Sequence, residues 1–261
     1  MTRHLRPLWL ALVLLTTLPV ARFIRAPITP GDQGRSVAWY PWVGALIGGL
    51  LAIVASITHG APSAVAAVVV LVAWVGLTGG LHLDGLADCT DGAFAGHGDP
   101  ARTLAVMREP TAGPMAIIAL VLVLLAKFAA LVVMLGDTAM ADAAGLWLIA
   151  VPLAARAAAA GLMAHTAYRR RAGIATDQAA WASRTAIWVS IGLALTIIAV
   201  LMSISSALLL ACTALAATVG WRWLWTARIG GYTGDTVGAL IELVEALLLI
   251  VVAWGGAATW A

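Results

Sequence analysis

Residues 115–136 read MAIIALVLVLLAKFAALVVMLG, a run in which Lys127 is the only charged residue. A helix of this length, at about 1.5 Å per residue, crosses the roughly 30 Å hydrocarbon core of a bilayer. Six similar runs cover residues 39–58, 62–81, 143–165, 186–204, 206–225 and 237–255. The 261 residues are 62% hydrophobic and only 10% charged, far from the composition of soluble proteins. We expect an all-α, polytopic membrane bundle of about seven transmembrane helices, forming one domain over 1–261.

A further apolar run, residues 8–20, is shorter and has basic residues on both sides. Arg3 and Arg6 precede it, and Arg22 and Arg25 follow it. Basic flanks favour the cytoplasmic side at both ends, which disfavours a complete crossing. The run also lacks a clear small-residue cleavage site for a signal peptide. It is therefore expected to form a re-entrant or interfacial helix.

Basic residues are distributed unevenly between the connecting loops. Thirteen of the fifteen Lys and Arg residues fall on one predicted face: Arg3, Arg6, Arg22, Arg25, Arg35, Arg102, Arg108, Arg169, Arg170, Arg171, Arg184, Arg222 and Arg228. By the positive-inside rule that face is cytoplasmic. The net charge of +3 is thus explained by membrane orientation, without nucleic acid as a partner. Two separate cysteines, Cys89 and Cys212, predict neither a disulfide framework nor a thiolate metal site.

An acidic motif occupies residues 79–92, GGLHLDGLADCTDG. Asp84, Asp88 and Asp91 are spaced four and three apart, so a helix would place them on one face. Three neighbouring carboxylates repel one another, and Mg²⁺, which prefers oxygen ligands, would relieve that repulsion and bridge to substrate phosphates. The alternative is a solvated acidic cap at a helix end. His82 in the same motif is a candidate general base, or a helix-end residue held by the backbone.

A second acidic motif occupies residues 230–245, GGYTGDTVGALIELVE. Asp235, Glu242 and Glu245 would share a helix face and complete the metal shell or hold a second ion. Ionisable residues within a span are costly and suggest function. The turn containing Gly231, Thr233 and Gly234 would expose backbone amides to a phosphate.

Lys127 and Arg156 lie deep within predicted spans. Two interpretations stay open for them: structural ion pairs with Glu242 or Glu245, or a basic wall that binds substrate phosphates. Gly44 and Gly48, four residues apart, predict close helix packing instead of a phosphate loop.

The sequence resembles the cobalamin synthase (adenosylcobinamide-GDP ribazoletransferase) family. The matching stretches are 39–48 (WYPWVGALIG), 80–92 (GLHLDGLADCTDG), 104–108 (LAVMR), 127–131 (KFAAL) and 230–239 (GGYTGDTVGA), followed by Glu242 and Glu245. The stretch 108–113 departs from the family pattern, because it lacks the second basic residue often found there. The resemblance implies a membrane enzyme of the late vitamin B12 pathway. Both acidic motifs fall on the basic face, so we expect a multi-pass protein of the cytoplasmic (inner) membrane with its active site facing the cytoplasm.

The implied reaction transfers the cobinamide phosphate of adenosylcobinamide-GDP to alpha-ribazole, or to its 5'-phosphate, and releases GMP. Mg²⁺ is the implied cofactor, and a homo-oligomer is left open. The expected catalytic residues are Asp84, Asp88, Asp91 and His82; the expected substrate-binding residues are Lys127, Arg156, Arg108, Gly231, Thr233 and Gly234; the expected metal ligands are Asp84, Asp88, Asp91, Asp235, Glu242 and Glu245.

Two other functions are compatible with parts of the sequence. Residues 88–95 fit the opening D-x-x-D-G-x-x-A of the CDP-alcohol phosphotransferases, which would act on a lipid alcohol. The arginine that follows in that motif is replaced by Gly96, and the later paired aspartates are missing at their usual distance. A cation- or proton-coupled transporter would use the intramembrane charges as a relay, but the chain shows no inverted repeat.

Overall fold

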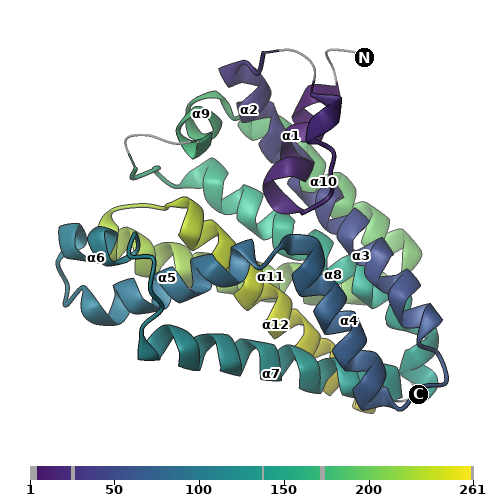
Figure 1. Ribbon diagram of the computed structural model, residues 1–261. Helices are drawn as coiled ribbons and strands as arrows, with labels where there is room; N and C mark the ends of the chain where they lie inside the picture. Colours follow the sequence, from purple (N-terminus) through teal and green to yellow (C-terminus); the bar gives the residue numbers. More distant parts are fainter. Residues whose placement is uncertain (1–4, 25–26, 137, 171–173, 260–261) are drawn as a thin grey trace.

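The computed structural model describes residues 5–24, 27–136, 138–170 and 174–259; residues 138–142, 174 and 256–259 are described only as parts of their helices. The described chain is helical (Figure 1). Its elements are α1 (Arg6–Leu15), η2 (Ala21–Phe23), α2 (Pro30–Ser36), η3 (Val37–Trp39), α3 (Tyr40–Ile57), α4 (Ser63–Thr78), α5 (Leu81–Ala95), α6 (Pro100–Val106), α7 (Pro114–Gly136), α8 (Thr138–His165), α9 (Ile174–Trp181), α10 (Arg184–Leu201), α11 (Ile204–Ile229) and α12 (Gly234–Thr259). The predicted all-α class is confirmed.

Each of the seven predicted spans is a helix. Six helices are long and apolar enough to cross a membrane: α3 together with α2, then α7, α8, α10, α11 and α12. The seventh, α4, is followed after Gly79 and Gly80 by α5, and the two helices are bent by 84°. Both glycines have positive φ, 63° and 70°, a region that side chains with a Cβ disfavour. The acidic motif therefore lies on a separate helix that turns away from α4.

The N-terminal apolar run is helical only in part. Helix α1 ends at Leu15, so the prediction of a helix over residues 8–20 is wrong for the second half of the run. There the backbone N–H of Thr17 donates to the carbonyl of Leu77 at 2.8 Å, which docks the segment on the end of α4. Ten helical residues extend only about 15 Å, so α1 is too short to span.

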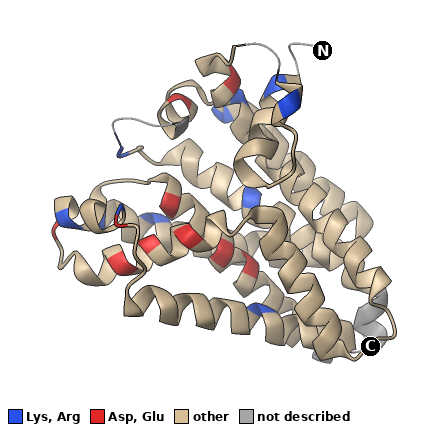
Figure 2. Cartoon of the chain, viewed as in Figure 1, with Lys and Arg blue, Asp and Glu red and all other residues tan. Residues whose placement is uncertain are grey.

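Helices α8 and α12 form the centre of the bundle, because most of their residues are buried, whereas α7, α10 and α11 expose apolar side chains on the perimeter. Most Lys and Arg residues lie toward the end of the molecule that holds the N-terminus and α6 (Figure 2). The described loops at the opposite end contain no Lys or Arg. Of the basic residues assigned to one face, Arg3, Arg25 and Arg171 lie outside the described residues.

Small residues let α3 approach α8 closely. A Cβ added at Gly44 would lie 2.3 Å from the carbonyl oxygen of Pro152, and one at Gly48 would lie 2.4 Å from that of Leu148. Real Cβ atoms do not approach so closely, so both positions require glycine. The prediction that these two glycines serve helix packing is confirmed.

We expect Gly44→Ala to lower the thermal stability of the protein in detergent, because the added methyl group must push α3 away from α8. Gly49→Ala is the matched control, since a Cβ there meets nothing within 4 Å and alanine favours the helix by roughly 1 kcal/mol. Thermal unfolding of both variants measures the difference. Equal midpoints for Gly44→Ala and Gly49→Ala would contradict the close packing of α3 on α8.

Candidate active site

Helix α5 and the start of α12 touch through glycines. A Cβ at Gly85 would lie 2.7 Å from the backbone oxygen of Asp235, and one at Gly238 would lie 3.2 Å from the Cα of His82. The two helices can therefore approach at backbone distance, which close packing through small residues permits in membrane proteins. This approach brings the first acidic motif against the beginning of the second.

Four carboxylates and one guanidinium gather at this junction, and we call them the outer cluster: Asp84, Asp88, Asp91, Asp235 and Arg170. The charge of Asp88 is repelled by the other three carboxylates and attracted by Arg170. Arg170 donates a hydrogen bond to Asp235 and another, at 3.4 Å, to the carbonyl of Met107. Figure 2 shows the acidic residues aligned along α5 and α12.

Arg170 was not among the residues predicted for the site. The sequence shows it only as one of three consecutive arginines, residues 169–171, a pattern that indicates membrane orientation but no site. Its pairing with Asp235 depends on where the chain returns after α8, which local spacing does not reveal.

Asp91 has backbone partners in the structure. Its carboxylate accepts from the N–H of Gly113 at 2.5 Å and from that of Ala116 at 3.1 Å, at the start of α7. Helix N-termini leave N–H groups unpaired, and a carboxylate stabilises them. A Cβ at Gly113 would lie 2.8 Å from Asp91. Asp91 thus ties α5 to α7, and its predicted role as a metal ligand stays a prediction.

The other predicted charges form a separate set, the inner network: Lys127, Arg156, Glu242 and Glu245. Lys127 Nζ lies 2.5 Å from a carboxylate oxygen of Glu242 and 2.5 Å from one of Glu245. Arg156 pairs with Glu245. All four are at most 3% exposed, and two cations face two anions, so the set is neutral. The ion pairs that the sequence left open are confirmed, and substrate binding by Lys127 and Arg156 stays a prediction.

His82 joins α5 to the inner network. Its Nδ1 lies 3.4 Å from an Nη of Arg156, and its Nε2 is buried without a partner among the described residues. A guanidinium only donates, so Nδ1 is the acceptor and a neutral ring carries its proton on Nε2. His82 is therefore held by a side chain of another helix, and the expected alternative of a backbone partner is not what the structure shows.

The turn before α12 is held by the segment after α8. The N–H of Tyr232 donates to the carbonyl of Ala167 at 2.9 Å, and a Cβ at Gly231 would lie 2.0 Å from that oxygen. The hydroxyl of Thr233 accepts from the N–H of Thr236 at 3.3 Å, so Thr233 caps α12.

The remaining predicted phosphate-binding residues lie at the surface. Gly234 is exposed and has open space around it, and Arg108 is exposed in the turn after α6. Gly231 and Thr233 already have packing and capping roles, so binding of phosphate by any of these four residues stays a prediction.

The six predicted metal ligands are divided between the two sets. Glu242 and Glu245 are engaged by Lys127 and Arg156, while the four aspartates belong to the outer cluster. Within the described ranges, no three His, Cys, Asp or Glu side chains converge closely enough to hold one metal ion among themselves. Mg²⁺ commonly binds one or two carboxylates together with substrate phosphates and water, and the oxygen donors of Asp84, Asp88 and Asp235 fit that chemistry.

We expect Arg156→Ala to lower the stability of the protein by roughly 3–5 kcal/mol, because it leaves Glu245 buried with less compensation. Arg184→Ala, at the exposed start of α10, is the control and should change stability little. The double variant Arg156→Met/Glu245→Gln keeps the neutral pair of Lys127 and Glu242, so it should recover part of the loss. The single variants Arg156→Met and Glu245→Gln complete a double-mutant cycle, and additive losses in that cycle would contradict the coupling.

The chain is similar to known proteins over nearly its whole length. A family described as Cobalamin-5-phosphate synthase matches residues 7–253. The chain is 42% identical to the adenosylcobinamide-GDP ribazoletransferase of Pseudomonas entomophila (strain L48), over 94% of this chain and 97% of that protein. Enzymes of the same name from Stutzerimonas stutzeri (strain A1501) and Pseudomonas syringae pv. syringae (strain B728a) are 44% and 43% identical, over 94% and 95% of this chain and 96% and 98% of theirs. No solved structure matches the chain. A match that runs from α1 to α12 shows that the chain belongs to the cobalamin-5-phosphate synthase family.

Proposed function

We propose that this chain transfers the cobinamide phosphate group of adenosylcobinamide-GDP to alpha-ribazole or its 5'-phosphate, and releases GMP. The observation that carries the proposal is the outer cluster: four carboxylates and Arg170 meet at one end of the bundle, where α5 and α12 approach through Gly85. Membership of the family supports the choice of substrates, since the relatives are named for this reaction. A CDP-alcohol substrate has weaker support, because residue 96 is glycine where that motif has arginine.

In the proposed step, a ribose hydroxyl of the acceptor attacks the phosphorus that carries the aminopropanol arm. A new oxygen–phosphorus bond forms, and the bond from that phosphorus to the bridging oxygen of the diphosphate breaks. GMP leaves with the bridging oxygen, and the proton of the hydroxyl passes to a base. Such reactions depend mainly on positioning and on stabilising the phosphoryl oxygens. Arg170, whose side chain is 22% exposed beside Asp235, is suited to that contact, because guanidinium groups bind oxyanions with paired N–H donors.

Mg²⁺ is the proposed cofactor, held by one or two of the carboxylates of Asp84, Asp88 and Asp235 together with the substrate phosphates and water. When bound, it would neutralise the charge on the diphosphate oxygens. Without a cation, a diphosphate would be repelled by these carboxylates. The cluster contains one arginine against four aspartates, so its uncompensated negative charge favours a divalent cation.

A carboxylate of α5 is the proposed general base. Asp84 is exposed and Asp88 is half-buried, so both can reach a bound hydroxyl. His82 is 2% exposed, and its Nδ1 faces Arg156, which leaves it poorly placed to exchange a proton with the acceptor. We therefore favour Asp84 or Asp88, whichever does not bind Mg²⁺, over His82 in this role.

The proposed location is the cytoplasmic (inner) membrane, with the outer cluster facing the cytoplasm. Support comes from Arg170, which pairs with Asp235, and from Arg102 and Arg108 on α6 and in the turn after it. Most Lys and Arg residues gather at the end of the molecule that holds α6 (Figure 2). Cytoplasmic loops carry such an excess of basic residues, and nucleotide substrates are available on that side.

We expect Asp88→Asn to lower turnover at least about 100-fold, the usual cost of removing one electrostatic contributor to a transition state. Thermal stability should stay equal or rise, because the change removes repulsion within the outer cluster. Release of GMP by the purified protein measures turnover. Glu109→Gln, an exposed acid outside the cluster, should retain activity. Near-normal turnover of Asp88→Asn at limiting Mg²⁺ would reject the assignment.

A further inference from the structure

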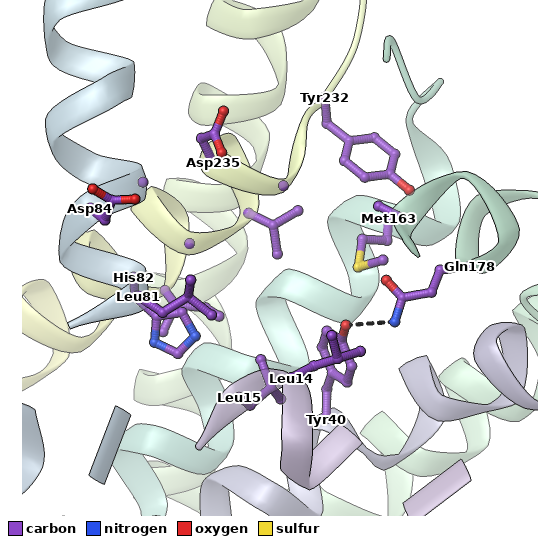
Figure 3. Close-up of a pocket in the computed structure, with 16 residues that line it drawn as sticks. Leu14, Leu15, Tyr40, Leu81, His82, Asp84, Met163, Gln178, Tyr232 and Asp235 are labelled. Carbon is purple, nitrogen blue, oxygen red and sulfur yellow. Dashed lines mark hydrogen bonds between the residues drawn. The ribbon is translucent and has the colours of Figure 1, made fainter. Parts of the chain in front are cut away.

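A cavity of about 210 Å³ adjoins the outer cluster, between α1, α5, α8, α9 and the start of α12. Figure 3 shows Asp84 and Asp235 on one side of it, and Tyr40 and Gln178 on the opposite side. A ligand whose phosphates lie at the two aspartates would therefore extend its other end toward Tyr40. The cavity is far too small for a corrin ring, so the group that fills it must be a terminal group of a substrate, such as a base.

The side walls of the cavity are apolar. They are formed by Leu14 and Leu15 of α1, Met163 of α8, and Val237 and Ile241 of α12. Apolar walls with a few fixed polar groups are typical of pockets that bind flat organic ligands. Methionine sulfur also packs favourably against aromatic rings. The walls therefore suit an aromatic base.

The polar end of the cavity has a fixed orientation. The amide nitrogen of Gln178 donates to Ser36 Oγ at 3.1 Å and to Tyr40 Oη at 2.9 Å. Ser36 donates its own proton to the carbonyl of Gln33 at 2.6 Å, so toward Gln178 it can only accept. If the amide turned over, Tyr40 could still donate to the oxygen, but the bond to Ser36 would be lost, because Ser36 already donates its proton to Gln33. Gln178 therefore keeps its carbonyl oxygen away from these two partners.

Two hydrogen-bonding positions remain unused at this end. The Oε1 atom of Gln178 accepts no hydrogen bond from another described residue, although the side chain is only 3% exposed. Tyr40, 4% exposed, accepts from Gln178 and keeps its own hydroxyl proton to donate. One acceptor thus stands beside one donor. A ligand in the cavity that offers the opposite pair would satisfy both groups.

We propose that this cavity binds the guanine base of the GDP moiety. Guanine presents an N1–H donor next to its O6 acceptor, which matches Gln178 Oε1 and the Tyr40 hydroxyl. The benzimidazole of alpha-ribazole has its second nitrogen attached to ribose and offers no such adjacent pair. The inference rests on the proposed function, and it adds that Tyr40 and Gln178 select the nucleotide donor.

The test is the displacement of radiolabelled GMP from the purified full-length protein in detergent with Mg²⁺. IMP keeps N1–H and O6 and should bind within about threefold of GMP, whereas 1-methyl-GMP lacks the donor and should bind about tenfold more weakly or worse. Tyr40→Phe should weaken GMP about tenfold. Tyr168→Phe, a matched change outside the cavity, should leave GMP binding unchanged.

Equal binding of GMP and 1-methyl-GMP by the wild-type protein would overturn the assignment, and this comparison needs no variant to fold. The assignment is also overturned if Tyr40→Phe raises KM for alpha-ribazole and leaves GMP binding intact, since the cavity would then hold the acceptor base. Guanine-selective binding without release of GMP from adenosylcobinamide-GDP would support the cavity assignment and reject the proposed function.

Discussion

Four charges buried in the centre of the bundle hold the helices in register. Lys127 of α7 and Arg156 of α8 pair with Glu242 and Glu245 of α12, and Lys127 also lies 4.9 Å from the ring of Trp74 on α4. An isolated charge at this depth would be strongly unfavourable. Each of the four side chains must therefore stay within reach of an oppositely charged partner. The network therefore fixes the rotation and depth of α12 relative to its neighbours.

That constraint has a consequence for the other end of α12. Asp235 precedes Glu242 by seven residues and lies on the same helix face. Because Glu242 and Glu245 are fixed against Lys127 and Arg156, Asp235 lies against α5. Gly85 leaves room there for the backbone of Asp235. We infer that the inner network serves the structure and the outer cluster serves the chemistry. The acidic residues of the second motif thus belong to two sets. Asp235 pairs with Arg170 in the outer cluster, and Glu242 and Glu245 pair with Lys127 and Arg156 deeper in the bundle.

The sequence predicted the spanning helices well, because an apolar run of a given length has few alternatives in a bilayer. It also predicted the packing role of Gly44 and Gly48 and the helix that carries the acidic motif. The 84° bend between α4 and α5 was missed, although the pair Gly79 and Gly80 was a visible signal. Positive φ at both glycines produces it.

Other features of the site arise from contacts between distant segments. Arg170 meets Asp235, Asp91 binds the backbone at the start of α7, and Gln178 of α9 reaches Tyr40. These partners are so far apart in the sequence that helical periodicity cannot predict their contacts. The intramembrane charges were found correctly, but sequence alone did not decide between their pairing with one another and the binding of phosphate.

The division between the two charge sets is tested most directly by a cryo-EM structure of the protein with GMP and Mg²⁺. We predict that the nucleotide phosphate lies within hydrogen-bond distance, about 3 Å, of Arg170 and beside Asp84 and Asp235. The pairs of Lys127 and Arg156 with the glutamates should remain intact. A phosphate bound instead to Lys127 or Arg156, with the glutamates displaced, would contradict the account.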